Sequence, residues 1–148
     1  MKRFQFALET ALRVRRLEAE VEEAKLLRLE LERAECRRNL DQLAAAARRR
    51  PACLLTGEPV SPAQLEDMHR LSAFIKKEKQ RLIAVEGALL HQIAFTSGQL
   101  QQAEKREELL ERLKSKEKDR WRLEADKELQ TLAEESYNHK FLLRIDAD

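Results

Sequence analysis

The sequence predicts an all-α protein in which two long helices form an antiparallel coiled-coil hairpin, with the second helix longer and overhanging the first. Charged residues make up 38% of the 148 residues and aromatic residues only 5%, a composition typical of long solvated helices. All three prolines lie in one short window, from Pro51 to Pro62. On both sides of this window, apolar residues recur at steps of three and four, as the buried face of a helix requires.

The first helix is predicted over about residues 6–50, where neither glycine nor proline occurs. Pro51 ends it, because the proline ring clashes with the preceding turn and its nitrogen carries no proton. The register is predicted to slip between Leu31 and Cys36. The predicted apolar seam consists of Val14, Leu17, Val21, Ala24 and Leu31, and then Cys36, Leu40, Leu43 and Ala47.

A turn over about residues 51–61 is predicted to lead into a second helix over about residues 62–143, so that residues 1–148 form a single domain. The stretch SPAQLED contains the start signal. Ser61 is suited to cap the helix and Pro62 to its first position, and Gln64 completes a capping box with the serine. A short connection of this kind favours folding the second helix back on the first.

Heptad counting along the second helix predicts how far the two helices pair. Nine of the fourteen seam positions between Leu65 and Leu110 are apolar, whereas only two of the next nine are. The first helix, with about 45 residues, reaches back to about residue 107 when folded on the second. Both estimates predict that the second helix is unpaired beyond about residue 110. The nine apolar residues are Leu65, Met68, Ile75, Leu82, Leu89, Ile93, Leu100, Ala103 and Leu110.

Two apolar surfaces are predicted to bind other proteins. The first is a stripe in the unpaired part, beyond the reach of the first helix, that includes Trp121, Ala125, Leu129 and Leu132. The second lies near the turn, where the register directs Leu71 and Phe74 toward solvent. Two readings of Phe74 stay open here: a docking surface for a partner, or packing against Leu54 and Leu55 of the loop.

The sequence predicts neither an enzyme nor a site for a metal, a cofactor or a small-molecule substrate. The three histidines are far apart in sequence, and no glycine-rich phosphate loop is present. Cys36 at a seam position is expected to act as a small hydrophobe, and Cys53 as an unactivated loop thiol. The formal net charge is only +2, and the basic run at Arg48–Arg50 suits a helix C-terminus, so nucleic acid is not an expected partner.

Cysteine usage and hydropathy predict the compartment. The two cysteines form no framework of spacings, which favours a reducing environment. No apolar run approaches the roughly 20 residues that a membrane span requires. A cytoplasmic protein is therefore expected.

The N-terminal stretch FQFALETALRVRRLEAE resembles the opening of the FliJ family of flagellar type III protein-export components. Two phenylalanines one residue apart precede Leu-Glu, a leucine, an arginine and an acid-rich helix. A second stretch, SAFIKKEKQ, resembles the Phe-Ile pair that the family carries early in its second helix. The chain ends in FLLRIDAD, where many members end in basic residues. The matching N-terminal residues are Phe4, Phe6, Leu8, Glu9, Leu12, Arg15 and Glu18.

The resemblance implies a non-enzymatic stalk, similar in design to the central stalk of rotary ATPases, that links the export ATPase hexamer to the membrane protein of the export gate. Export chaperones are further implied partners, and the implied location is the cytoplasmic side of the inner membrane, in peripheral association with the export apparatus. Phe74, with Leu71, would contact the gate. The residues expected near the ATPase ring are Phe4, Phe6, Trp121, Leu129 and Leu132.

Three alternatives remain at this point. The equivalent stalk of a virulence-type type III secretion system shares this design, and the sequence does not separate the two systems cleanly, although the N-terminal phenylalanines favour the flagellar one. A dimeric coiled-coil scaffold or secretion chaperone would use two chains to supply the seam. An amphipathic membrane binder would use residues 1–16 and predicts liposome binding that is lost when Phe4 and Phe6 become serine.

Overall fold

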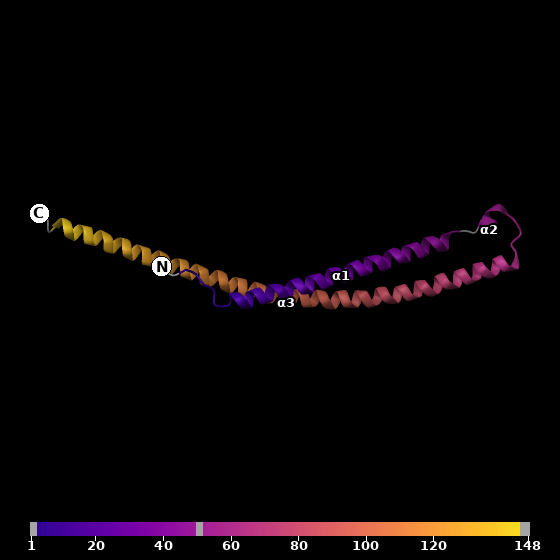
Figure 1. Cartoon of the computed structure of the whole chain (residues 1–148), viewed down its shortest axis with the longest axis horizontal. Coiled ribbons are helices and arrows are strands. Elements are labelled where there is room, and N and C mark those ends of the chain that lie inside the picture. Colours follow the sequence, from indigo (N-terminus) through magenta and orange to yellow (C-terminus); the bar gives the residue numbers. More distant parts are fainter. Residues whose placement is uncertain (1–2, 50–51, 146–148) are drawn as a thin grey trace. The chain divides into compact units, whose positions relative to one another are not determined.

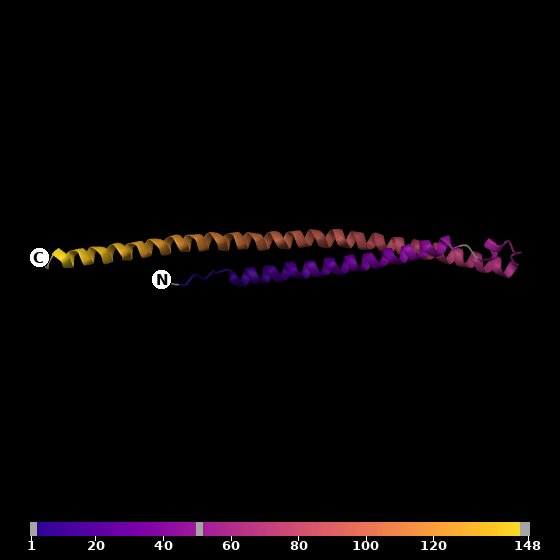
Figure 2. The ribbon, with the colours of Figure 1, turned by 90° about the horizontal axis from the view of Figure 1, so that it is seen from above.

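The structure is a computed structural model that describes residues 3–49 and 52–145. Its elements are α1 (Glu9–Arg48), the short α2 (Ala52–Thr56) and α3 (Pro62–Ile145). Figures 1 and 2 show α1 and α3 as unbroken helices, of 40 and 84 residues. The described residues contain no strand. The prediction of an all-α protein dominated by two long helices is confirmed.

The contacts between α1 and α3 divide into two compact units, which are described separately. Unit 1 consists of Met1–Ala19 and Gln102–Asp148, and unit 2 of Glu20–Gln101. Each unit therefore contains a piece of α1 and a piece of α3.

The N-terminal boundary of α1 differs from the prediction. The helix begins at Glu9, three residues later than expected, and residues 3–6 have no regular secondary structure. The Glu9 N–H donates to the Phe6 carbonyl oxygen at 3.2 Å, and the Leu12 N–H to that of Leu8 at 2.9 Å. At the other end α1 ends at Arg48, about two residues before the predicted end near residue 50, and Arg49 is not helical.

α3 begins at Pro62, the residue at which the capping signal predicts its start. The Ser61 N–H donates to Gln64 Oε1 at 2.9 Å, and the Gln64 N–H donates to Ser61 Oγ at 3.3 Å. This reciprocal pair is a capping box, with Pro62 at the first helical position. Before it, Gly57 ends α2 with a φ of +69°, a conformation that glycine adopts without steric cost.

The buried face of α1 is not the one that the sequence predicted for its first half. Val14, Leu17, Val21 and Leu31 are all exposed. The covered positions instead follow an uninterrupted three–four repeat, without the predicted slip near Leu31. In unit 1 they are Leu12, Arg15 and Ala19, and in unit 2 they are Glu22, Leu26, Leu29, Arg33, Cys36, Leu40 and Leu43.

The register predicted for α3 is confirmed over most of its length. Three predicted seam residues near its start, Leu65, Ser72 and Lys79, are exposed. The predicted seam positions that are covered are, in unit 2, Met68, Ile75, Leu82, Glu86, Leu89, Ile93, Thr96 and Leu100, and in unit 1, Ala103, Glu107, Leu110, Lys114, Glu117 and Trp121.

Unit 2 has a small apolar core where the two helices meet. Cys36, Leu82 and Leu89 are buried, and they are joined by Leu40 and Leu43 from the same face of α1. The Cys36 thiol donates to the Leu82 carbonyl oxygen at 3.4 Å. Cys36 therefore behaves as the small hydrophobe that was predicted.

Candidate partner-binding surfaces

The aromatic residues of the N-terminal motif lie against α3 within unit 1. The Phe4 ring contacts the Trp121 ring, with centroids 5.9 Å apart and planes tilted by 55°, a geometry favourable for aromatic pairs. Phe6 is buried, with 7% of its surface exposed. A hollow of about 500 Å³ beside them is lined by Arg3, Phe4, Gln5, Phe6, Glu9 and Lys114.

Ion pairs continue this contact between α1 and α3 in unit 1. Lys114 Nζ lies 2.7 Å from Glu9 Oε2. Arg16 donates from Nη2 to Glu111 Oε1 at 2.6 Å and from Nε to Glu107 Oε1 at 3.2 Å. The hydrogen bond from Lys114 lowers the pKa of Glu9, and the hydrogen bond to Glu111 raises the pKa of Arg16.

The paired part of α3 therefore extends beyond the predicted limit near residue 110. Trp121 was expected to lie beyond the reach of the first helix. The residue whose ring contacts it is Phe4, which precedes α1 in the sequence. An extended chain advances about 3.3 Å per residue and a helix about 1.5 Å. A few non-helical residues can thus cover a much longer stretch of α3 than the same number of helical residues.

Beyond Trp121, the apolar stripe of α3 is covered at one position and open at the others. Ala125, one turn after Trp121, is buried, with 5% exposed. Leu129 and Leu132 are exposed, and so is Tyr137. The predicted binding stripe thus has a covered beginning and an uncovered continuation.

Leu71 and Phe74 are exposed on α3 in unit 2, as their register predicts, with 60% of the Phe74 surface accessible. Leu54 and Leu55 of α2 are themselves exposed. Leu71 borders a hollow of about 300 Å³ that is lined by Ala46, Ala47, Arg49, Met68, Leu71, Ser72 and Ile75. Most of the Phe74 ring is accessible to a partner.

Phe74 lies beside a small charged group on the same helix. Arg81 donates to Glu78 one turn away, and this hydrogen bond lowers the pKa of Glu78. Both side chains line a hollow of about 280 Å³ together with Phe74, Leu82, Asn39, Gln42 and Leu43. An apolar ring next to a fixed charge pair is a surface that can select a partner by both properties.

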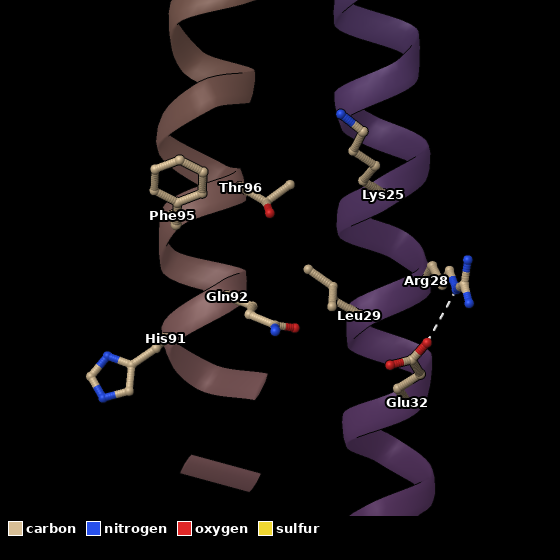
Figure 3. A pocket seen from close by; sticks show the side chains of 8 residues that line it. All are labelled: Lys25, Arg28, Leu29, Glu32, His91, Gln92, Phe95 and Thr96. Carbon is tan, nitrogen blue, oxygen red and sulfur yellow. Dashed lines mark hydrogen bonds and ion pairs between the residues drawn. The ribbon is translucent and has the colours of Figure 1, made fainter. Parts of the chain in front are cut away.

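A third surface, which the sequence analysis did not single out, is a groove between α1 and α3 in unit 2 (Figure 3). It measures about 490 Å³. Leu29 and Thr96 point into the space between the helices. Phe95 lies over α3 instead, and 71% of its surface is exposed. The sequence contained one signal for this groove, because Phe95 directly precedes Thr96, a small polar residue at a predicted seam position. The lining residues are Lys25, Arg28, Leu29, Glu32, His91, Gln92, Phe95 and Thr96.

The rim of this groove on α1 is electrically balanced. Lys25 Nζ donates to Glu22 Oε1 at 2.6 Å, and Arg28 Nε donates to Glu32 Oε1 at 3.1 Å. Each cation is neutralised by a carboxylate of its own helix, as is common for pairs three or four residues apart. The groove offers apolar contact without a net charge.

The described residues contain no group of three or more histidine, cysteine or acidic side chains able to hold a metal ion. Cys36 is free and buried, and the side chain of Cys53 lies outside the described part of the chain. Within the described residues, no helix is long and apolar enough to cross a membrane.

The arrangement defines, at the level of class, an all-α protein whose candidate sites are apolar surfaces on paired helices. Comparisons with protein-family models, with curated proteins and with solved structures gave no match.

Proposed function

We propose that this chain is a non-enzymatic stalk and coupling protein of the flagellar export apparatus, which links the export ATPase ring to the membrane export gate. The proposal starts from the resemblance of the N-terminal motif to the FliJ family. The observation that carries it furthest is the packing of that motif. Phe6 and Leu12 are buried and Phe4 contacts Trp121, so three residues of the motif pack within unit 1.

We further propose that α1 and α3 form an antiparallel hairpin. In unit 1, Glu9 pairs with Lys114, whereas the later Arg16 pairs with the earlier Glu107. Unit 2 repeats this order, because Leu29 shares a groove with Gln92 and Thr96, whereas Leu43 shares one with Phe74 and Glu78. Rising residue numbers on α1 meet falling numbers on α3 in each unit, which supports opposite helix directions.

The two predicted binding surfaces receive different partners in this proposal. The ATPase hexamer is expected at unit 1, where Phe4, Phe6, Trp121, Leu129 and Leu132 gather on or beside α3. The gate protein is expected at Leu71 and Phe74 in unit 2. Export chaperones are further candidate partners. The protein would then be cytoplasmic and peripherally associated with the inner-membrane apparatus.

A stalk of this kind needs stiffness and a surface that does not adhere to its surroundings. The 29 basic and 27 acidic residues are interspersed and nearly cancel, which suits movement within a protein complex. Pairs such as Arg112 with Glu108 and Arg28 with Glu32 give local support to the exposed helix faces.

Export ATPase activity and ring assembly test the unit 1 surface. We expect the full-length chain to stimulate the ATPase, and the double variant Leu129→Ser/Leu132→Ser to lose most of that stimulation. Both leucines are exposed, so the variant should fold normally. The double variant Val21→Ser/Leu31→Ser is the matched control, because its leucine and valine are equally exposed on α1. Equal stimulation by all three proteins would remove this stripe as the docking element.

Binding to the purified cytoplasmic part of the gate protein tests the second surface. Leu71→Ala/Phe74→Ala should weaken binding by about 10-fold or more, because exposed aromatic anchors dominate such interfaces. Phe95→Ala removes another exposed phenylalanine from α3 and should leave the affinity unchanged. Loss of binding in the Phe95→Ala control alone would relocate the gate surface to the groove of Figure 3.

The second candidate is a dimeric coiled-coil scaffold or secretion chaperone. The exposed residues Val21, Ala24, Leu27 and Leu31 favour it, because apolar residues at steps of three and four can pair with another helix. Sedimentation separates the candidates: a monomer supports the stalk, and a stable dimer supports the scaffold. The virulence-type stalk shares the stalk geometry and would be distinguished by which ATPase the chain stimulates.

A further inference from the structure

The first described residues form a short cover on α3 in unit 1. Residues 3–6 are not helical, and their phenylalanines pack inward instead of facing solvent. Phe4 lies on Trp121, and Phe6 is buried two residues later. The segment 3–6 is called the N-terminal cover below.

The cover occupies the start of the stripe on which the proposed ring partner docks. Trp121 and Ala125 are one helical turn apart and are the covered members of this stripe, whereas Leu129 and Leu132 continue it in exposed positions. Opening of the cover would free Trp121, which lies on the same helix face as Leu129 and Leu132, so that the three could form one apolar surface. The surface of α3 that is available to a partner therefore depends on the state of the cover.

The described contacts of the cover are of a kind that opens readily. It is held by the Phe4–Trp121 ring contact, by burial of Phe6 and, at its base, by the ion pair of Glu9 with Lys114. Apart from the hydrogen bond of the Glu9 N–H to the Phe6 carbonyl oxygen, these contacts come from side chains. A non-helical segment held in this way can open locally while both helices stay folded. A tilted aromatic pair biases such an equilibrium by about two- to ten-fold.

We propose that the N-terminal cover is a removable lid that hides Trp121 in the free chain, and that the ring partner binds this part of α3 only after the lid opens. The proposal rests on the proposed function for the identity of the partner. The claim that the lid hides Trp121 concerns this chain alone and does not depend on the partner. The lid makes binding a two-step process, in which the closed population lowers the apparent affinity.

Tryptophan fluorescence tests the lid without any partner, because Trp121 is the single tryptophan of the chain. Collisional quenching by acrylamide is compared among the full-length wild type, Phe6→Ala and Phe95→Ala. The ring contact with Trp121 comes from Phe4, so greater quenching in Phe6→Ala shows that the whole segment opens. We expect the ratio of open to closed forms to rise about 100-fold or more in Phe6→Ala, because the substitution removes a buried phenylalanine from the closed form alone, and to stay unchanged in Phe95→Ala. Identical quenching of Trp121 in all three proteins would overturn the lid.

Binding to the export ATPase tests the docking step by the sign of the effect. If the lid competes with the partner, Phe6→Ala binds more tightly than the wild type, by the factor by which the open population rises in the quenching experiment, because more of the chain is competent. Weaker binding of Phe6→Ala would show that the segment belongs to the interface itself and would overturn the competition. Absence of binding by every variant would reject the proposed function together with the docking step, while the quenching experiment would still decide whether the lid exists.

Discussion

The two faces of α1 differ in a way that hydrophobicity alone does not explain. The outer face carries a stripe of exposed valine and leucine, including Leu31 with 62% of its surface accessible. The face toward α3 carries Leu12, of which only 1% is exposed, but also the covered residues Arg15, Glu22 and Arg33. The buried face thus carries charged residues at several positions, whereas the outer face carries a stripe of apolar ones. A helix in a pair buries the face that matches its partner, even where another face is more apolar.

Charged seam residues are compatible with this pairing because their partners lie across the contact or close by. In unit 2, Glu86 accepts a hydrogen bond from Arg37 at 2.8 Å and has Arg33 at 3.8 Å. The long stems of arginine and glutamate also cover apolar surface while their charged ends stay near solvent. No buried side-chain nitrogen or oxygen among the described residues is left without a partner.

Truncation of Leu12 should produce the largest difference between the two faces. Leu12→Ala removes a fully buried side chain in unit 1, and we expect a loss of about 2–5 kcal/mol in the free energy of unfolding. Leu31→Ala removes the same atoms from the outer face, with an expected loss below about 0.5 kcal/mol. Denaturant unfolding monitored by circular dichroism measures both. Equal losses would contradict the assignment of the faces.

Replacing a small residue by a larger one tests the same difference between the buried and the outer face of α1. Ala19 is buried in the seam, and Ala24 is exposed on the outer face. Ala19→Leu should destabilise the protein by about 1–3 kcal/mol through overpacking, whereas Ala24→Leu should be nearly neutral. Thermal unfolding of the two variants provides the measurement. A stable Ala19→Leu protein would mean that the seam at this position is loosely packed.

Removal of a charge from the seam should have a smaller effect. Glu86→Ala leaves Arg37 without its 2.8 Å partner, and we expect a loss of about 1 kcal/mol because the pair is only partly buried. Glu30→Ala, at an exposed position of α1, is the control. A double-mutant cycle with Arg37→Ala isolates the pairwise term. Additive single effects would show that this pair does not contribute to stability.

The smallest expected effect is a pH dependence in unit 1. The hydrogen bond from Lys114 lowers the pKa of Glu9 below its ordinary value. A lowered carboxyl pKa in the folded state contributes stability above the unfolded pKa, and this contribution disappears as the pH falls through the folded pKa. Carboxyl titration by NMR should show the pKa of Glu9 rising toward its ordinary value in Lys114→Met. An unchanged titration curve would exclude the ion pair as the cause.

Much of the fold could be predicted because its signals are local. The end of α2 follows from the positive φ that Gly57 adopts, and the start of α3 from the pairing of Ser61 with Gln64. Pro51 lies outside the described residues, so its part in ending the first helix stays a prediction. The register of α3 could also be predicted, because its apolar residues are numerous and recur at steps of three and four on only one face of the helix. The exposure of Leu71 and Phe74 then followed from that register.

The candidate site was predictable only in part. The sequence indicated Phe4, Phe6 and Trp121 as partner-binding residues, but the structure places Phe4 on Trp121 and buries Phe6. A heptad count assumes helical spacing, so it could not anticipate a non-helical segment that reaches past the end of α1. Whether the indicated residues bind a partner stays a prediction.

The amino-acid sequence on its own determined the helix class, the place where the helices are interrupted and the cap that begins α3, because each depends on backbone preferences within a few residues. The tertiary structure decided which face of α1 is buried and what covers Trp121. Those choices depend on the free energy of pairing with α3, which is a property of both surfaces together. A single helix with two apolar stripes has no local interaction that distinguishes between them.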